Sequence, residues 1–135
     1  ILEMEIVMTQ REVRDEIFKI LFEHEVVNSD IAVRKNEVLE TLKISKDKRE
    51  FLENYLDNFV LNGAKIIEKV KEKIKGWTFS RLANPEKVIL KMAFFEILFE
   101  EIGYEIVVNE AVELSKIYGD EKTKTFINGI LASFN

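Results

Sequence analysis

Apolar residues recur every three or four positions along most of the chain, which is the spacing of one buried face on an α-helix. The first such segment runs from about Thr9 to Val26. Thr9, with Glu12 three residues later, predicts a capping box at its start. A second helix is expected to begin near Asp30. The inward positions of these two helices are Val13, Ile17, Ile20, Leu21, Ile31, Val38, Leu39 and Leu42.

A long periodic segment follows Ser45, which we expect to cap it, and continues to Gly76, a natural stop for a helix. The segment can form one long helix, or two helices with a break near Asn62-Gly63. Its inward positions are Phe51, Leu52, Tyr55, Leu56, Phe59, Ile66, Ile67, Val70 and Ile74.

The stretch from Pro85 to about Glu100 is apolar on nearly every side, which predicts a helix at the centre of a core. Asn84 is expected to cap this helix, with proline at its first position. Thr78, a few residues earlier, can start a short helical turn.

Two further helices complete the pattern. Asn109 is expected to cap the first of them and Gly119 to end it, and Thr123 is expected to cap the last. Gly129 lies within the last helix, where we expect it to allow a close approach between helices. With one proline and five glycines in 135 residues, the pattern predicts an all-α domain of six or seven helices.

Composition narrows the function classes. The chain has no cysteine, no Gly-rich phosphate loop and no Gly-x-Ser-x-Gly elbow. His24, the only histidine, is expected to be a surface or partly packed residue, and the pair Glu96 and Glu100 is more typical of a solvated helix face than of a catalytic site. We therefore expect no enzyme, metal or cofactor. No apolar run reaches the length of a membrane span, and the absence of cysteine fits a reducing cytoplasm.

The charge of −5 is unevenly distributed, because residues 64–91 carry eight Lys and Arg against three Glu. This basic middle is either a solvated helix face or an anion-binding surface. Lys65, Lys69 and Lys73 recur every four residues on one helix face. Trp77 is either an apolar anchor at a helix junction or a surface for base stacking, and Phe79 and Tyr104 are further stacking candidates.

Several motifs in the C-terminal half occur together in one known family. They are Trp77, Arg81-Leu82, Glu86-Lys87, Leu90-Lys91, Ala93, Phe95-Glu96-Ile97, "VNEAVELSKIYG" from Val108 to Gly119, and "FINGIL" from Phe126 to Leu131. In order and spacing the chain resembles the family of the transcription antitermination factor NusB. The "ILFEHE" that ends the first predicted helix is also similar to that family, whereas residues 27–62 match it only in helical character.

The resemblance implies an all-α, NusB-like domain over residues 1–135, built from two small helical-bundle subdomains at about 9–75 and 76–135. Residues 1–8 are expected to be disordered or to be an addition to the natural chain. The family is not enzymatic. It pairs with NusE, a small-subunit ribosomal protein, binds boxA RNA, and acts with RNA polymerase in an antitermination complex that promotes transcription of ribosomal RNA operons.

The resemblance also implies an RNA-binding surface. The family's arginine-rich motif corresponds to Arg11 and Arg14 here, with acidic residues beside them, and two basic positions of the central helix correspond to Lys87 and Lys91. Glu86 falls on the surface that faces NusE. The turn after Gly119, where the family often carries acidic residues, instead has Lys122 and Lys124, and Phe126 follows as an aromatic contact to RNA or as a core anchor. Lysine in place of arginine keeps the positive charge but lacks the planar guanidinium that can bind a phosphate through two hydrogen bonds.

Two other interpretations remain at this point. The chain could be the NusB-like RNA-binding domain of an RNA methyltransferase, or a helical protein-interaction module without a role in RNA binding. A homodimer is possible under each of these two interpretations and also for an antitermination factor.

Overall fold

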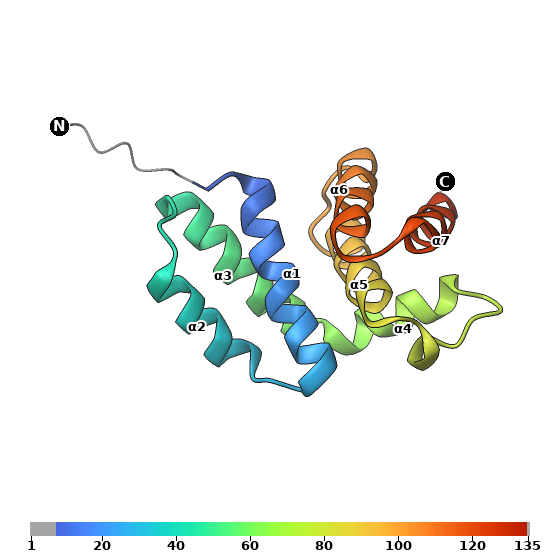
Figure 1. Cartoon of the computed structure of the whole chain (residues 1–135), viewed down its shortest axis with the longest axis horizontal. Helices are drawn as coiled ribbons and strands as arrows, with labels where there is room; N and C mark the ends of the chain where they lie inside the picture. The colour runs from blue at the N-terminus through green and yellow to red at the C-terminus, as the bar shows by residue number, and fades with distance from the viewer. Residues whose placement is uncertain (1–7, 135) are drawn as a thin grey trace. The chain divides into compact units, whose positions relative to one another are not determined.

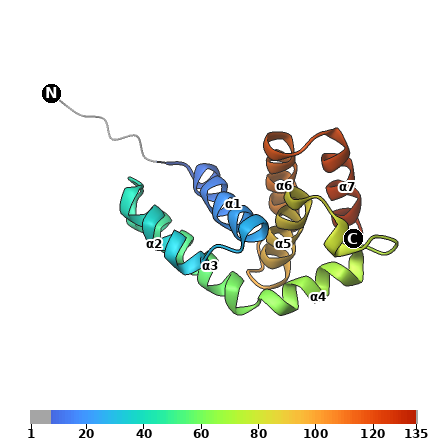
Figure 2. The same ribbon diagram turned by 60° about the horizontal axis from the view of Figure 1, so that its bottom comes forward.

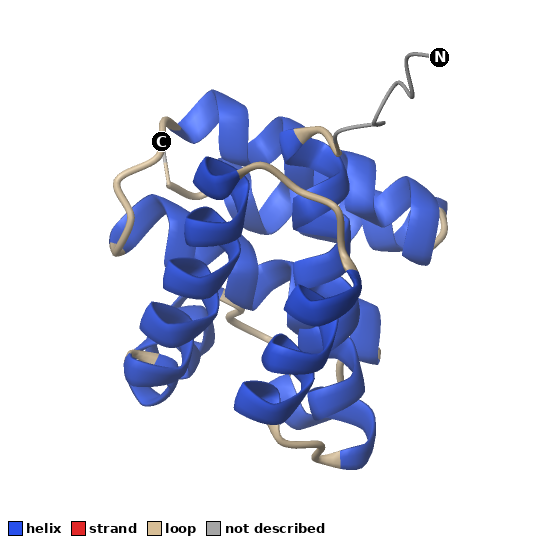
Figure 3. Ribbon diagram, turned by 90° about the vertical axis from the view of Figure 1, so that its left-hand side faces the viewer, coloured by secondary structure: helices blue, strands red, loops and turns tan. Residues whose placement is uncertain are grey.

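The computed structural model describes residues 8–134, so the expectation for residues 1–8 lies, apart from Met8, outside the described part of the chain. Within it every regular element is a helix, as Figure 3 shows, which confirms the predicted all-α class. The elements are α1 (Gln10–Val27), α2 (Ile31–Thr41), α3 (Lys46–Leu61), α4 (Gly63–Lys73), the 3₁₀ turn η1 (Phe79–Arg81), α5 (Asn84–Leu98), α6 (Tyr104–Tyr118) and α7 (Glu121–Ala132).

The chain divides into two compact units between Leu61 and Asn62. The sequence predicted the division later, between residues 75 and 76. The difference arises because the long periodic segment is two helices, and the second of them, α4, packs against α5 of the C-terminal unit through the fully buried Ile66 and Val70.

In the N-terminal unit, α1, α2 and α3 pack against one another (Figure 1). The predicted capping box of α1 is confirmed: the Thr9 hydroxyl accepts the Glu12 N–H at 3.1 Å, and the Glu12 carboxylate accepts the Thr9 N–H at 2.8 Å. Asp30 caps α2, and the Ser45 hydroxyl accepts the Lys48 N–H at 3.3 Å at the start of α3, as expected.

The packing of α2 on α3 relies on polar contacts as well as on apolar side chains. Both terminal nitrogens of the Arg49 guanidinium donate to the Leu39 carbonyl at 2.9 Å, which satisfies a backbone acceptor near the end of α2. The Lys35 ammonium lies 2.8 Å from the Asp57 carboxylate. Of the four inward positions predicted for α2, only Leu39 is fully buried.

In the C-terminal unit, α5 is the central helix, and α4, α6 and α7 all pack against it. Figure 2 shows α6 beside α5 and α7 beside α6. The predicted central helix is confirmed because every residue from Val88 to Glu96 is buried. Such a helix buries apolar surface on all sides and so forms the centre of the core of this unit.

The N-caps predicted for α5 and α6 are wrong. Ala83 precedes α5, and its N–H is accepted by the Glu86 carboxylate at 3.0 Å, so Asn84 is already helical. Helix α6 begins after Gly103, and Asn109 lies exposed within it, because the residues from Tyr104 onward continue the apolar periodicity upstream of the asparagine.

Helix α7 starts earlier than expected. Asp120, and not Thr123, is its cap, and the two residues form a reciprocal pair: the Asp120 carboxylate accepts the Thr123 N–H at 2.9 Å, and the Asp120 N–H points to the Thr123 hydroxyl at 3.3 Å. Gly129 has open space around its Cα, so the predicted close approach is wrong there. Gly119 is the tightly packed glycine: a Cβ built on it would lie 2.6 Å from the Thr123 Cβ.

Candidate nucleic-acid interface

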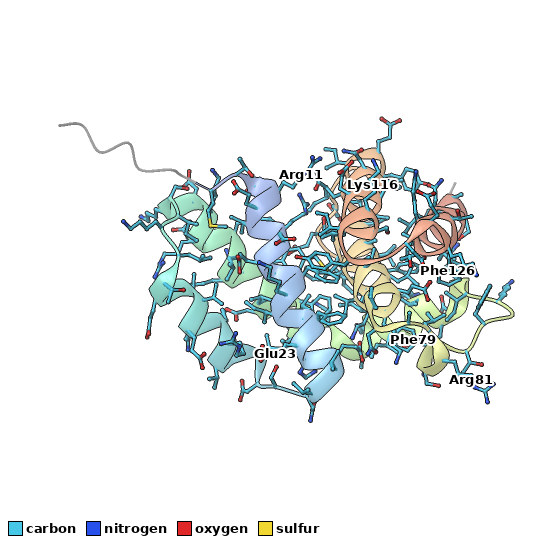
Figure 4. The ribbon with its side chains drawn as sticks, viewed as in Figure 1. Arg11, Glu23, Phe79, Arg81, Lys116 and Phe126 are labelled. Atoms are coloured by element: carbon cyan, nitrogen blue, oxygen red, sulfur yellow. The ribbon has the colours of Figure 1, made fainter. Side chains whose placement is uncertain are left out.

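The basic residues predicted on α1 have different surroundings. Arg11 is exposed on the first turn of the helix (Figure 4). Arg14 is only 6% exposed, and its guanidinium carbon lies 5.8 Å from the centre of the Phe51 ring of α3. This burial argues against a direct phosphate contact by Arg14 and gives it a packing role within the N-terminal unit.

The predicted residues of α5 are also not equivalent. Lys91 is 9% exposed and belongs to the buried part of the helix. Lys87 is half-buried, with its ammonium 6.0 Å from the centre of the Phe79 ring. Glu86 is half-buried too, and its carboxylate is used to cap α5 at Ala83. Lys87 is therefore the residue of this group that remains available to an anion.

The predicted residues of α7 lie on its first two turns. Lys122 is exposed, whereas Lys124 and Phe126 are half-buried. Hydrogen bonds from the backbone and side chain of Thr123 hold the pKa of Asp120 below its ordinary value, so the cap carries a negative charge at neutral pH. That charge suits the positive end of the helix and partly offsets the two lysines.

The aromatic residue next to this turn is Trp77. Its ring centre lies 4.9 Å from that of Phe126, at an interplanar angle of 64°, so the two residues form an edge-to-face pair. Trp77 is 60% exposed, which disfavours its interpretation as a buried anchor. The sequence left two interpretations of Trp77 open, an apolar anchor or a surface for base stacking, because its partner comes from a helix far along the chain and no local signal reports that contact.

The other two candidate stacking residues have structural contacts. Phe79 is half-buried on η1 beneath Lys87, whereas its neighbour Arg81 is exposed and points away from the unit (Figure 4). The Tyr104 hydroxyl donates to the Leu131 carbonyl at 2.8 Å and so ties α6 to α7. Neither ring is presented to solvent as the Trp77 ring is.

The lysine stripe of α4 is partly engaged within its own unit. Lys69 lies 3.7 Å from the Glu72 carboxylate. The Lys73 ammonium donates to the Ser133 carbonyl at 3.3 Å and lies 5.2 Å from the centre of the Phe134 ring. Lys65, in contrast, is exposed. The stripe thus contributes to the stability of the C-terminal end as well as to the positive charge of this region.

Among residues 8–134, no group of three or more His, Asp or Glu side chains could hold a metal ion. His24 is partly packed, as predicted, with Nδ1 2.7 Å from the Ser29 carbonyl oxygen. The helices in the described part of the chain are all too short or too polar to cross a membrane.

The sequence profile of the NusB family matches residues 11–135. The transcription antitermination protein NusB of Wolinella succinogenes is 32% identical over 123 residues, which cover 91% of each protein. NusB of Alkaliphilus oremlandii is 34% identical over 128 residues, which cover 94% of this chain and 93% of the relative.

Solved structures give the same result. T. maritima NusB is 30% identical, with a TM-score of 0.82, and the match covers 95% of this chain and 91% of that one. A chain in the crystal structure of the antitermination factors NusB and NusE in complex with dsRNA is 25% identical, with a TM-score of 0.82, and the match covers 92% of this chain and 93% of that one.

Proposed function

Because the chain belongs to the NusB family, we propose that it is a transcription antitermination factor that binds RNA and pairs with NusE. The observation that carries this proposal is the likeness, over 92% of the chain, to a protein solved together with NusE and double-stranded RNA. The proposal extends to boxA-type RNA, to the RNA polymerase antitermination complex, and to transcription of ribosomal RNA operons in the cytoplasm. It includes no catalytic step.

The charges of the described residues support specific positions for the RNA. Arg11, Lys87, Lys122 and Lys124 are exposed or half-buried, and each can neutralise a phosphate. Phe126 adds an aromatic surface beside Lys122. Arg14 and Lys91, which are buried, support the helices that carry these residues. Glu86 is proposed to lie on the NusE-facing surface in addition to its capping role.

Fluorescence anisotropy with labelled RNA tests the proposal. The chain with NusE should bind boxA RNA more tightly than a scrambled RNA of equal length, and the chain alone should bind more weakly than the pair. The logarithm of the affinity should fall linearly with the logarithm of the salt concentration, by about 0.7 to 0.9 for each phosphate contact. Equal affinity for both RNAs, with no response to salt, would exclude the antitermination function.

A matched pair of double variants tests the position of the RNA site. Charge reversal at Lys122 and Lys124 should weaken RNA binding, because two attractive groups become repulsive. The same reversal at the exposed Lys65 and Lys71 of α4 changes the net charge equally and should weaken binding less. The helical circular dichroism of both variants should match that of the unmodified chain. Equal losses of affinity would mean that only overall charge matters.

A further inference from the structure

Trp77 is an exposed aromatic residue that is held in place. It follows Gly76, whose φ of +86° is left-handed, in the turn from Ile74 to Trp77 that comes after the end of α4 at Lys73. The Trp77 N–H donates to the Ile74 carbonyl at 2.9 Å, and Phe126 contacts the indole from α7. A large aromatic side chain that stays mostly in solvent, while its backbone is hydrogen-bonded and a second ring contacts it, is suited to bind a flat partner.

The charges around Trp77 indicate the nature of this partner. Lys122 lies four residues before Phe126 and so shares its face of α7. Lys75 and Arg81, which flank Trp77 in sequence, are both exposed. Exposed cations that neighbour an open aromatic ring are complementary to a nucleotide, which has a negative phosphate and a flat base.

We propose that Trp77 stacks on an unpaired base of the bound RNA, with Phe126 supporting the indole and Lys122 contacting a neighbouring phosphate. The inference rests on the proposed function and adds to it a specific nucleotide contact. The base must be unpaired, because the bases of a duplex are already stacked on each other, whereas single-stranded bases can turn outward onto an aromatic side chain. Base stacking is tolerant of sequence, so this contact would contribute affinity more than discrimination.

Trp77 is the only tryptophan of the chain, so its fluorescence reports directly on stacking. Addition of the complex with NusE to labelled boxA RNA measures RNA binding by anisotropy, and addition of unlabelled boxA RNA to the complex measures stacking by indole emission. The indole emission should be quenched with the dissociation constant that anisotropy gives. The same titration with Trp77→Phe corrects for any tryptophan in the partner.

Two substitutions separate stacking from charge. Trp77→Leu should weaken RNA binding by about 5- to 150-fold, the range for loss of one base–aromatic stack, and should leave the salt dependence unchanged. Trp77→Phe, which keeps an aromatic face, should lose less. Lys122→Ala should show the reverse result, with a salt slope smaller by about 0.7 and with quenching retained. Thermal unfolding of each variant checks that the fold persists.

Replacing single nucleotides of the RNA by abasic sites completes the test. One abasic position should abolish the quenching and reproduce the affinity of Trp77→Leu, because the sugar and phosphate remain while the base is missing. RNA binding without quenching, together with unchanged affinity of Trp77→Leu, would overturn the stacking proposal and leave the proposed function intact. Quenching on addition of NusE before RNA would identify Trp77 as a protein contact and also overturn it. If neither anisotropy nor indole emission shows RNA binding, both the stacking proposal and the proposed function are overturned.

Discussion

The starts of α1 and α7 use the same capping chemistry in opposite order. In α1 the cap is Thr9 and the third helical residue is Glu12, whereas in α7 the cap is Asp120 and the third residue is Thr123. Each pair satisfies backbone N–H groups that no helical carbonyl can reach. Both helices also carry an exposed basic residue at their second position: Arg11 in α1 and Lys122 in α7.

The two starts differ in the residues that come after this basic position. In α1 the next basic residue, Arg14, is buried over Phe51 and contributes to packing. In α7 the aromatic residue Phe126 follows one turn later. Its ring contacts Trp77, which remains largely exposed to solvent. A capping box therefore fixes where a helix begins and how its first turn faces, whereas the contacts inside each unit decide whether that turn is used for stability or for recognition.

Gly119→Ala should have the largest effect at the start of α7. The added Cβ would lie 2.6 to 2.7 Å from three side-chain atoms of Thr123, which cannot move away without breaking the cap. We expect a loss of about 1–3 kcal/mol in the free energy of unfolding, measured in urea.

Gly129→Ala is the matched control for this substitution. The site lies within α7 and has open space around it, so alanine should stabilise the protein by about 0.5–1 kcal/mol. A loss of stability at Gly129 as large as that at Gly119 would show that close packing to Thr123 does not explain the effect.

Substitution of the two arginines of α1 tests their division of roles. Arg14→Ala should lower the free energy of unfolding by about 1–2 kcal/mol, because it removes a cation–π contact and buried aliphatic carbons. Arg11→Ala should change stability by less than about 0.5 kcal/mol and should reduce the salt slope of RNA binding by about 0.7 to 0.9. Denaturation in urea and RNA titration of both variants provide the measurements, and reversed effects would contradict the assignment.

Thr9→Ala removes the side-chain half of the α1 box. Loss of such a cap lowers the free energy of unfolding by about 1 kcal/mol. Thr9→Ser keeps the hydroxyl group and should retain most of that stability. If alanine and serine give the same unfolding midpoint in urea, the hydrogen bond from the Glu12 N–H contributes nothing measurable.

The sequence predicted those elements whose signals lie within a few residues of one another. The Thr9 box, the Ser45 cap and the buried helix α5 are of this kind, and the break at Asn62-Gly63 was one of the two alternatives left open. The starts of α6 and α7 were predicted a few residues too late, because Asn109 and Thr123 are good caps that lie downstream of the true starts at Gly103 and Asp120. In α7 Asp120 and Thr123 are both residue types that commonly cap helices. Only the backbone conformation shows that the helix begins after Asp120.

The candidate site was less predictable than the fold. The resemblance gave Arg11, Arg14, Lys91 and the turn with Lys122 the same expected role, although Arg11 and Lys122 are exposed and Arg14 and Lys91 are buried. The position of Trp77 depends on Phe126, a residue of another helix. Such contacts follow from the packing of each unit and leave no periodic signal in the sequence.

The smallest expected effect is the dependence of the two caps on pH. Hydrogen bonds from Thr9 hold the pKa of Glu12 below its ordinary value of 4.5, and hydrogen bonds from Thr123 hold the pKa of Asp120 below 3.8. Each carboxylate therefore stabilises the folded state above its unfolded pKa, and this contribution is lost as the pH falls through the folded value. The amide protons of Thr9 and Thr123, which the carboxylates accept, should titrate in NMR spectra with midpoints below 4.5 and 3.8, respectively. Glu12→Gln and Asp120→Asn should each abolish the titration at one helix and leave the other unchanged, and midpoints at or above the ordinary values would show that the boxes do not hold their charge.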